Sequence, residues 1–270
     1  MAFDGITIAS LTKECQDKIL NSRIYKIAQP EKDELILTLK AESGTYRLFL
    51  SADASLPLMY FCDENKPSPM TAPNFCMLLR KHLQNGRIVG IRQPSLERIV
   101  CLDIEHLDEL GDLCRKTLII ELMGKHSNII FCDSNQKIID SIKHISGMVS
   151  SVREVLPGRE YFIPDTMEKK NPLSTDFTAF SEIFSKSTPV FKALYTSFTG
   201  FSPTIAQEIS NRAGVDSDLP ANVLSDAQKL ALFDAFSQII TLVKTENFSP
   251  CIYFQNGMPM EFSVLPLSTY

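Results

Sequence analysis

Basic side chains are concentrated in one short stretch of an otherwise acidic chain. Residues 71–98 hold five Lys or Arg residues against one acid, Glu97, and so carry a formal charge of +4, whereas the chain as a whole carries −5. The basic residues are Arg80, Lys81, Arg87, Arg92 and Arg98. Such a local reversal of sign indicates an anionic partner, of which a nucleic-acid backbone is the commonest. The alternative is a solvated face with ordinary charges, and the charge count does not decide between the two.

Glu97 and Arg98 are adjacent and stand at the start of an expected strand, just after Pro94 and Ser95. Neighbouring side chains of a strand point to opposite faces, so these two charges do not simply neutralise each other. One of them could contact a base or a sugar hydroxyl while the other contacts a phosphate or an internal partner. A pair of ordinary charges on an edge strand is the competing interpretation.

A second polar segment, 121–128, joins two apolar runs. It begins with Glu121, and Gly124 permits a tight turn. The donors that follow are Lys125, His126, Ser127 and Asn128. This loop could hold a phosphate or a ribose, or it could be a hairpin in which Ser127 and Asn128 bond to their own backbone. A third candidate is the helix start at 200–206, because helix N-termini attract phosphate, although a routine capped helix explains it equally well.

The sequence offers no motif for catalysis or metal binding. Gly86 and Gly90 lack the spacing of phosphate-binding loops, and no Gly-x-Ser-x-Gly elbow is present. The four histidines are far apart, and none of the seven cysteines has Cys-x-x-Cys spacing, so we predict free, buried thiols in a reducing compartment. We therefore expect no catalytic residues, no metal and no cofactor.

Composition and the N-terminal residues bear on location. The chain is 44% hydrophobic and 22% charged, as is usual for a globular protein with a real core. Asp4 interrupts the start of the chain, which lacks the apolar region of a signal peptide. No run reaches the length of roughly 18 apolar residues that a membrane-spanning helix needs. We expect a cytoplasmic protein with no membrane partner.

The first half of the chain is expected to be rich in strands. Helical spacing of apolar residues predicts one helix over 7–20, capped by Thr7, and a second over 71–84, with Pro73 in its first turn and Gly86 as its C-cap. Acidic residues at 103–112 are expected in a solvated hairpin loop. Short β-rich runs predict antiparallel strands at 23–28, 34–40, 45–51, 57–62, 87–93, 98–104, 117–123, 127–133 and 137–142.

The composition changes at 157–172, where prolines and polar residues predict a linker. Ser202 with Pro203 starts one of the helices expected beyond it, and Ser225 with Gln228 forms a capping box at the start of another. The expected helices are 176–185, 189–196, 203–213, which Gly214 caps, and 227–244.

A hairpin is expected at the end of the chain. Asn256-Gly257 between two β-rich runs, 251–254 and 258–263, predicts it, and we expect it to pack back on the first domain. The predicted domains are 1–172, 173–246 and 247–270.

Long strings of residues, rather than isolated positions, match one family. They include Phe3-Asp4-Gly5, Arg23–Pro30, Phe75–Leu83, Glu97–Val100, Glu121–Ile130, Pro157–Tyr161 and Gly200–Pro203. On these strings the chain resembles the N-terminal part of the NFACT family, from residue 3 to at least residue 265. The resemblance implies an α+β fold. Its first part would be an antiparallel β-sandwich with flanking helices, like the N-terminal domain of formamidopyrimidine-DNA glycosylases, followed by a helix-hairpin-helix-like domain.

The resemblance also implies a function in ribosome-associated quality control. Family members bind tRNA and a large ribosomal subunit that still carries peptidyl-tRNA, and they recruit charged tRNA, alanyl-tRNA in bacteria, for template-free C-terminal tailing of the stalled chain. The ribosome makes the peptide bond, so we expect this protein not to be an enzyme. The family continues into a coiled coil, and we expect this chain to be a fragment that ends about where the coiled coil begins. The alternative is a fibronectin-binding surface adhesin, which an older family label implies.

The resemblance points to one pair of residues in particular. An Asp-Arg pair of the family falls on Glu97 and Arg98, with the acid one methylene longer in this chain. DNA glycosylases of similar fold use an N-terminal proline amine and an adjacent glutamate, and neither is found at the start of this chain, so that likeness concerns fold alone. The expected tRNA-binding residues are Arg80, Lys81, Arg87, Glu97, Arg98, Glu121, Lys125, His126, Ser127 and Asn128.

Overall fold

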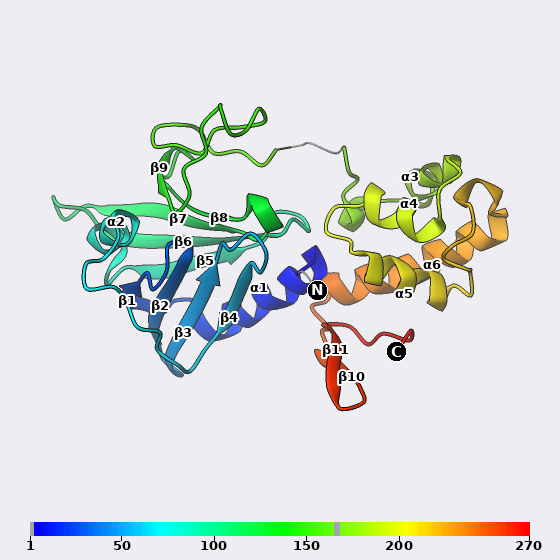
Figure 1. Cartoon of the computed structure of the whole chain (residues 1–270), viewed down its shortest axis with the longest axis horizontal. Helices are drawn as coiled ribbons and strands as arrows, with labels where there is room; N and C mark the ends of the chain where they lie inside the picture. The colour runs from blue at the N-terminus through cyan, green and yellow to red at the C-terminus, as the bar shows by residue number, and fades with distance from the viewer. Residues whose placement is uncertain (1–2, 165–167) are drawn as a thin grey trace.

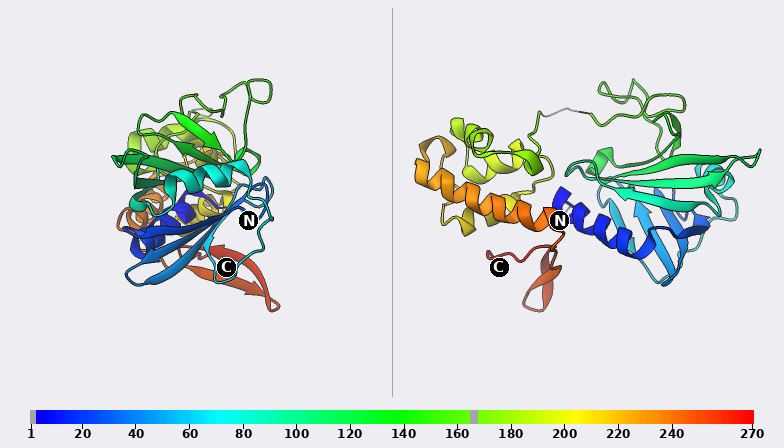
Figure 2. Two further views of the ribbon diagram at one scale, coloured as in Figure 1. Left: turned by 90° about the vertical axis from the view of Figure 1, so that its left-hand side faces the viewer. Right: turned by 180° about the vertical axis from the view of Figure 1, so that it is seen from behind.

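Two lobes of different secondary structure lie along the longest axis of the molecule (Figure 1). The computed structural model describes residues 3–164 and 168–270. One lobe is built on a nine-stranded antiparallel sheet and the other on helices, so the expected α+β class is confirmed. Seen from behind in Figure 2, the helix α1 (Gly5–Ile19) of the β lobe begins where the long helix α6 (Asp226–Lys244) of the helical lobe ends.

The sheet has the strand order β4-β3-β2-β1-β5-β6-β7-β8-β9. In the described residues β1 meets β5 through a single register pair, Arg23 opposite Arg87, so the sheet divides there into two halves. Buried side chains of both halves, of α1 and of α2 (Asn74–Leu83) form one core. The strands are β1 (Arg23–Ala28), β2 (Glu34–Ala41), β3 (Gly44–Ser51), β4 (Leu58–Phe61), β5 (Arg87–Arg92), β6 (Ile99–Leu107), β7 (Leu113–Glu121), β8 (Asn128–Cys132) and β9 (Ile138–Ser141).

Several predicted helix ends were wrong by a few residues. Asp4, not Thr7, caps α1, because its carboxylate accepts a hydrogen bond from the backbone N–H of Thr7 at 2.8 Å. Asn85, not Gly86, takes the left-handed conformation after α2, with φ +66°. Gly86 serves instead for close packing, since a Cβ there would lie 2.9 Å from the carbonyl oxygen of Leu83.

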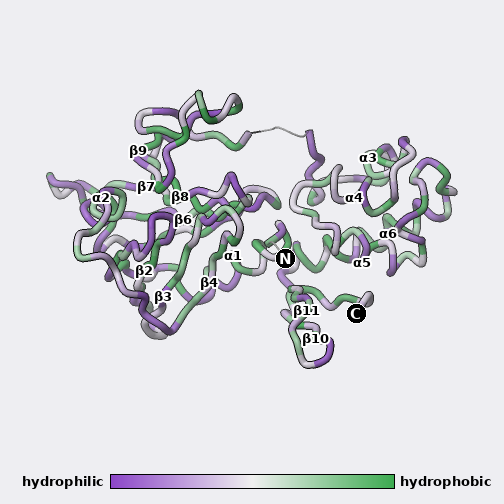
Figure 3. Tube along the Cα trace, viewed as in Figure 1, coloured by the Kyte–Doolittle hydropathy of each residue, from purple (hydrophilic) through white to green (hydrophobic). Residues whose placement is uncertain are grey.

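The predicted acidic loop is shorter than expected. Asp103 and Glu105 lie within β6 and form ion pairs with Arg92 and Arg115, so the loop proper is only 108–112. Its hydrophilic residues form the tip of the β6–β7 hairpin at the far end of the β lobe (Figure 3).

A segment after β9 covers the outer face of the second half of the sheet. Val155 is buried there among side chains of β6, β7 and β8, and Tyr161 and Ile163 pack beside it. Residues 157–163, which we predicted to belong to a linker, are therefore packed on the β lobe. The rest of that predicted linker includes residues 165–167, which lie outside the described residues.

The helical lobe follows the predicted pattern closely. Its core is aromatic, with the Phe180 ring 4.9 Å from that of Phe236 and 5.9 Å from that of Phe198, measured between centroids. The Ser225–Gln228 capping box starts α6 as predicted. The remaining helices are α3 (Phe177–Glu182), α4 (Val190–Ser197) and α5 (Pro203–Arg212), with 3₁₀ turns η2 (Pro172–Ser174), η3 (Ile183–Ser185) and η4 (Ala221–Val223).

The C-terminal hairpin forms as predicted. Its strands, β10 (Cys251–Gln255) and β11 (Met258–Ser263), make a separate two-stranded sheet, and Asn256 and Gly257 both have positive φ in the turn. The ring of Phe262 lies 5.9 Å from that of Phe3. The residues after the hairpin belong to the helical lobe, since Val264 and Leu265 are part of its core. The hairpin thus touches the first domain through Phe3, while its exit is held by the second.

Candidate nucleic-acid interface

Three backbone segments meet where the two lobes join. The N–H of Gly5 donates to the carbonyl of Gly200 at 2.8 Å. A Cβ on Gly5 would lie 2.0 Å from the carbonyl oxygen of Leu96, and one on Gly200 would lie 2.2 Å from the same oxygen. The Leu96 side chain is itself buried in the helical core, although it belongs to the β lobe. This contact, which we call the glycine junction, fixes the position of the residues that follow Leu96.

The helices α1 and α5 begin side by side at the glycine junction. Besides capping α1, the carboxylate of Asp4 accepts a hydrogen bond from the Ser202 hydroxyl at 2.7 Å, and Ser202 caps α5. Two positive helix ends therefore share one carboxylate, which stabilises both. The start of α5, which we considered as a phosphate site, already has its negative partner within the protein.

Glu97 and Arg98 follow Leu96 in a tightly held turn. The amide of Gln93 donates to the carbonyls of both Gly5 and Glu97 at 2.8 Å, and Ser95 has φ +51°. The carbonyl of Arg98 accepts from the N–H of Leu122 at 2.9 Å, which brings the turn next to the loop after β7. Both side chains are half-buried. The structure thus brings together two segments that we singled out separately in the sequence.

The loop after β7 contains one exposed turn and two structural residues. Lys125 and His126, in the 3₁₀ turn η1 (Gly124–His126), are exposed. The Ser127 hydroxyl accepts from the N–H of Met123, and the Asn128 amide bonds to both backbone groups of Lys143. Ser127 and Asn128 are buried, so the alternative in which they bond to backbone is the one the structure shows. Both side chains thus have an internal structural role, and their contact with tRNA stays a prediction.

Glu121 is also an internal residue. It is fully buried, and its carboxylate accepts from Arg153 at 2.5 Å and from the Tyr161 hydroxyl at 2.8 Å. Burial and the neighbouring Glu121 charge raise the pKa of Tyr161, which therefore stays a hydrogen-bond donor. Arg153 also donates to the carbonyl of Phe162. Glu121 thus ties the segment after β9 to the sheet, and its contact with tRNA stays a prediction.

The charges around α2 do not form one surface with Arg98. Arg80 donates to the carbonyl of Ile27 at 2.9 Å, and Lys81 forms an ion pair with Glu109 at 2.8 Å. Arg87 is exposed at the start of β5. Figures 1 and 2 place α2 at the end of the β lobe that is farthest from the helical lobe. The basic stretch 71–98 therefore divides into two separated groups.

Sequence reasoning missed Lys169, which lies near Arg98. Its ammonium donates to the carbonyl of Tyr195 in α4 at 3.2 Å. Burial, and next the positive charge of Arg98, lower the pKa of Lys169, and Glu97 acts in the opposite direction. The Lys169-Lys170 dipeptide was visible in the sequence, but nothing there placed it beside Arg98.

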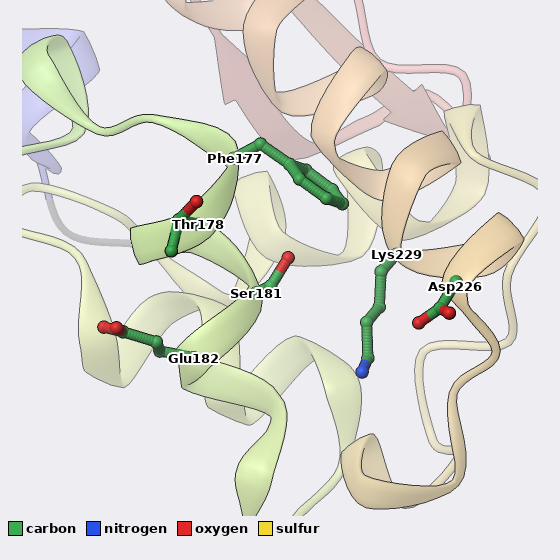
Figure 4. A pocket seen from close by; sticks show the side chains of 6 residues that line it. All are labelled: Phe177, Thr178, Ser181, Glu182, Asp226 and Lys229. Atoms are coloured by element: carbon green, nitrogen blue, oxygen red, sulfur yellow. The ribbon is translucent and has the colours of Figure 1, made fainter.

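Hollows in the surface lie elsewhere. One, of about 660 Å³, lies between α3 and α6, where Ser181 and Lys229 face each other (Figure 4). Its other lining residues are Phe177, Thr178, Glu182 and Asp226. None of the expected tRNA-binding residues lines it. No group of three or more His, Cys, Asp or Glu side chains among the described residues could hold a metal ion.

Cysteines in the structure are free, and burial is confirmed for Cys15, Cys76, Cys101 and Cys132, whereas Cys62, Cys114 and Cys251 are half-buried. Within residues 3–164 and 168–270, no helix has both the length and the apolar character to cross a membrane.

Comparison with known proteins gives a consistent match. The family model described as the NFACT N-terminal and middle domains matches residues 4–270. The chain is 35% identical over 259 residues to the Rqc2 homologue RqcH of Bacillus subtilis, covering 95% of this chain and 44% of that protein. Ribosome quality control complex subunit 2 of Saccharomyces cerevisiae is 28% identical over 51% of this chain and 12% of that protein. The chain thus spans less than half the length of the curated relatives it matches.

Solved structures agree over the whole chain. The N-terminal part of a fibronectin/fibrinogen-binding protein from Streptococcus suis superposes with a TM-score of 0.78 at 30% identity, covering 99% of this chain and 91% of that one. A fibrinogen-binding protein from Staphylococcus aureus gives a TM-score of 0.81 at 28% identity, covering 100% and 92%.

Proposed function

The chain belongs to the NFACT family, and from that premise we propose that it is the tRNA- and ribosome-engaging part of a ribosome-associated quality-control factor. In this role it binds tRNA and the obstructed large ribosomal subunit, and it recruits alanyl-tRNA for template-free tailing of the stalled chain. The ribosome forms the peptide bond, so the protein works as a recruiting factor in the cytoplasm and not as an enzyme.

One observation carries the proposal. Arg98 is half-buried in a turn fixed by the glycine junction, next to the loop that exposes Lys125 and His126, and its positive charge lowers the pKa of Lys169. An arginine on a fixed backbone can place its planar fork on a phosphate or a base edge, which favours a specific contact over a diffuse one. The remaining expected residues around α2 would contribute general attraction to RNA.

The proposal is tested by titrating the chain with fluorescently labelled alanine tRNA at rising salt concentration, and by sedimenting it with large ribosomal subunits. Phosphate-led binding releases counterions, so the affinity should fall steeply with salt. Unchanged affinity across the salt series, or no association with either partner, would contradict it.

Fibronectin binding is the second candidate, favoured by the name of the relative from Streptococcus suis. Its test is binding of the chain to immobilised fibronectin, with Arg98→Ala as the comparison variant. Tight binding that this substitution leaves unchanged would favour the adhesin, because it would use a surface other than the glycine junction.

A further inference from the structure

Lys169 and Arg98 belong to segments of the two lobes that backbone contacts connect through the glycine junction. Arg98 follows the turn of the β lobe, whereas the backbone of Lys170 pairs with the segment that leads to Gly200, donating to the carbonyl of Ser197 at 2.8 Å and accepting from the N–H of Thr199 at 3.0 Å. The same segment ends at the glycine junction, which holds Leu96. The positions of Lys169 and Arg98 are thus fixed relative to each other by one short chain of backbone contacts.

The two positive charges of Arg98 and Lys169 outnumber the one negative charge of Glu97 that acts on Lys169. The guanidinium is a permanent cation in proteins, so the charge of Arg98 opposes the charge on Lys169. Glu97 has the opposite effect, but the fall in the pKa of Lys169 shows that burial and Arg98 outweigh it. Among the described residues, neither Arg98 nor Lys169 forms an ion pair. An anion bound between them would replace repulsion by two attractions.

We propose that Arg98 and Lys169 form a two-cation subsite, one cation from each lobe, that binds a phosphodiester of an RNA backbone. The inference rests on the proposed function and deepens it by naming the group that is bound. Arginine forks onto two phosphate oxygens, and lysine acts as a compact charge, so the pair suits a single phosphate. Because the two cations come from different lobes, the bound strand crosses the glycine junction.

Lys170 provides a matched control for Lys169. It is the next residue in the chain and carries the same charge, but its ammonium is paired with Glu182 at 3.0 Å. We expect Lys169→Gln to weaken binding of labelled alanine tRNA roughly tenfold and to lower the slope of log affinity against log salt by about 1. Lys170→Gln should leave both nearly unchanged. Thermal melts of each variant establish that the chain is folded.

The pH dependence separates a phosphate contact from a structural role. The groups that face the Lys169 ammonium are Arg98, Glu97 and the carbonyl of Tyr195. As the pH rises through the lowered pKa of Lys169, its charge is lost and the affinity of the wild-type chain should fall. Lys169→Arg, which does not titrate in this range, should keep the affinity and remove that fall.

The results of these titrations distinguish failure of the Arg98–Lys169 subsite from failure of the proposed tRNA-binding function. If the wild-type chain binds tRNA and Arg98→Ala weakens it, but Lys169→Gln has the wild-type salt slope, the subsite is wrong and the proposed function stands. Equal losses for Lys169→Gln and Lys170→Gln would also overturn the subsite. No binding of tRNA by the wild-type chain removes both. Inorganic phosphate that stabilises the wild-type chain but not Lys169→Gln against heat, while the two bind tRNA equally, would show that the pair binds free phosphate rather than an RNA strand.

Discussion

The basic groups near α2 and those at the glycine junction differ in what surrounds them. Arg80 and Lys81 lie on one helix and are close in sequence, yet each already has a partner in the chain, the carbonyl of Ile27 and the carboxylate of Glu109. Arg98 and Lys169 are distant in sequence, but backbone contacts at the glycine junction connect their segments, and the charge of Arg98 lowers the pKa of Lys169. The denser cluster of positive charge in the sequence is therefore the one that is better neutralised in the structure.

The density of charged residues in the sequence therefore does not show which charges are available to a ligand. What shows it is whether each charged side chain already has a partner within the protein. A charge with an internal partner contributes to stability, so removing it should lower the free energy of unfolding. A charge that lies near another charge of the same sign can contribute to binding, so removing it should lower the affinity for the ligand. We therefore expect each of the following substitutions to lower mainly the stability of the fold or mainly the affinity for tRNA.

Glu121 is the most strongly partnered of the expected tRNA-binding residues, and its removal should have the largest effect. Glu121→Ala leaves the nearly buried Arg153 without its carboxylate, so we expect the free energy of unfolding to fall by about 3–5 kcal/mol. Denaturant titration measures it. The control is Glu105→Ala, which removes an ion pair to the exposed Arg115 and should cost far less. A stable Glu121→Ala variant with weakened tRNA binding would instead support the predicted contact of Glu121 with tRNA.

The glycine junction can be broken by one methyl group. Gly200 has φ +80°, so Gly200→Ala puts an alanine into a left-handed conformation. It also places a Cβ 2.2 Å from the carbonyl oxygen of Leu96. We expect a loss of about 2–4 kcal/mol in the free energy of unfolding, from the combined strain of overpacking and conformation. Gly214→Ala is the matched control, because it has φ +65° and nothing within 4 Å of the new methyl group.

The two alanine variants should also differ in binding. Gly200→Ala shifts Leu96 and with it the turn that carries Arg98, so tRNA affinity per folded molecule should fall, whereas Gly214→Ala should bind as the wild type does. Equal stability and equal binding of the two variants would mean that the glycine junction does not position Arg98.

Arg98→Ala should have the opposite profile to Glu121→Ala. We expect tRNA binding to weaken by about 1–3 kcal/mol, with little change in stability, because Arg98 has no ion pair among the described residues. Isothermal titration gives the affinity, and thermal melting gives the stability. Glu97→Asp, which restores the shorter acid of the family, should be tolerated or improve binding. A lowered melting temperature with unchanged affinity for Arg98→Ala would make it a structural arginine.

The sequence predicted most helices and strands, though not all of their ends, but it did not predict how the site is assembled. Asn256-Gly257, the Ser225–Gln228 box and the alternation of Leu35, Leu37 and Leu39 in β2 each depend on a few neighbouring residues, so their elements could be predicted. The roles of Glu121 and Asn128 depend on Arg153, Tyr161 and Lys143, which lie far along the chain, and no local pattern reveals such partners.

The glycine junction was hidden for the same reason. Gly5, Leu96 and Gly200 come from three distant segments, and each looks ordinary in its own surroundings. Lys169 could be placed beside Arg98 only once that contact was known, since the pair is assembled by the meeting of the two lobes.

Lys81→Gln should have the smallest effect and is the sharpest test of the comparison. Lys81 is exposed and carries the same charge as Lys169, but it is paired with Glu109 and lies at the far end of the β lobe. Its removal leaves Glu109 unpaired in water, where a carboxylate is well solvated, so stability should hardly change. If RNA binds mainly across the glycine junction, tRNA affinity should fall much less than for Arg98→Ala, and only at low salt, where long-range attraction acts.

Parallel titrations of the two variants at low and physiological salt measure this. Should Lys81→Gln weaken binding as much as Arg98→Ala at both salt concentrations, the α2 charges would belong to the interface despite their partners, and the distinction drawn between the two regions would be wrong.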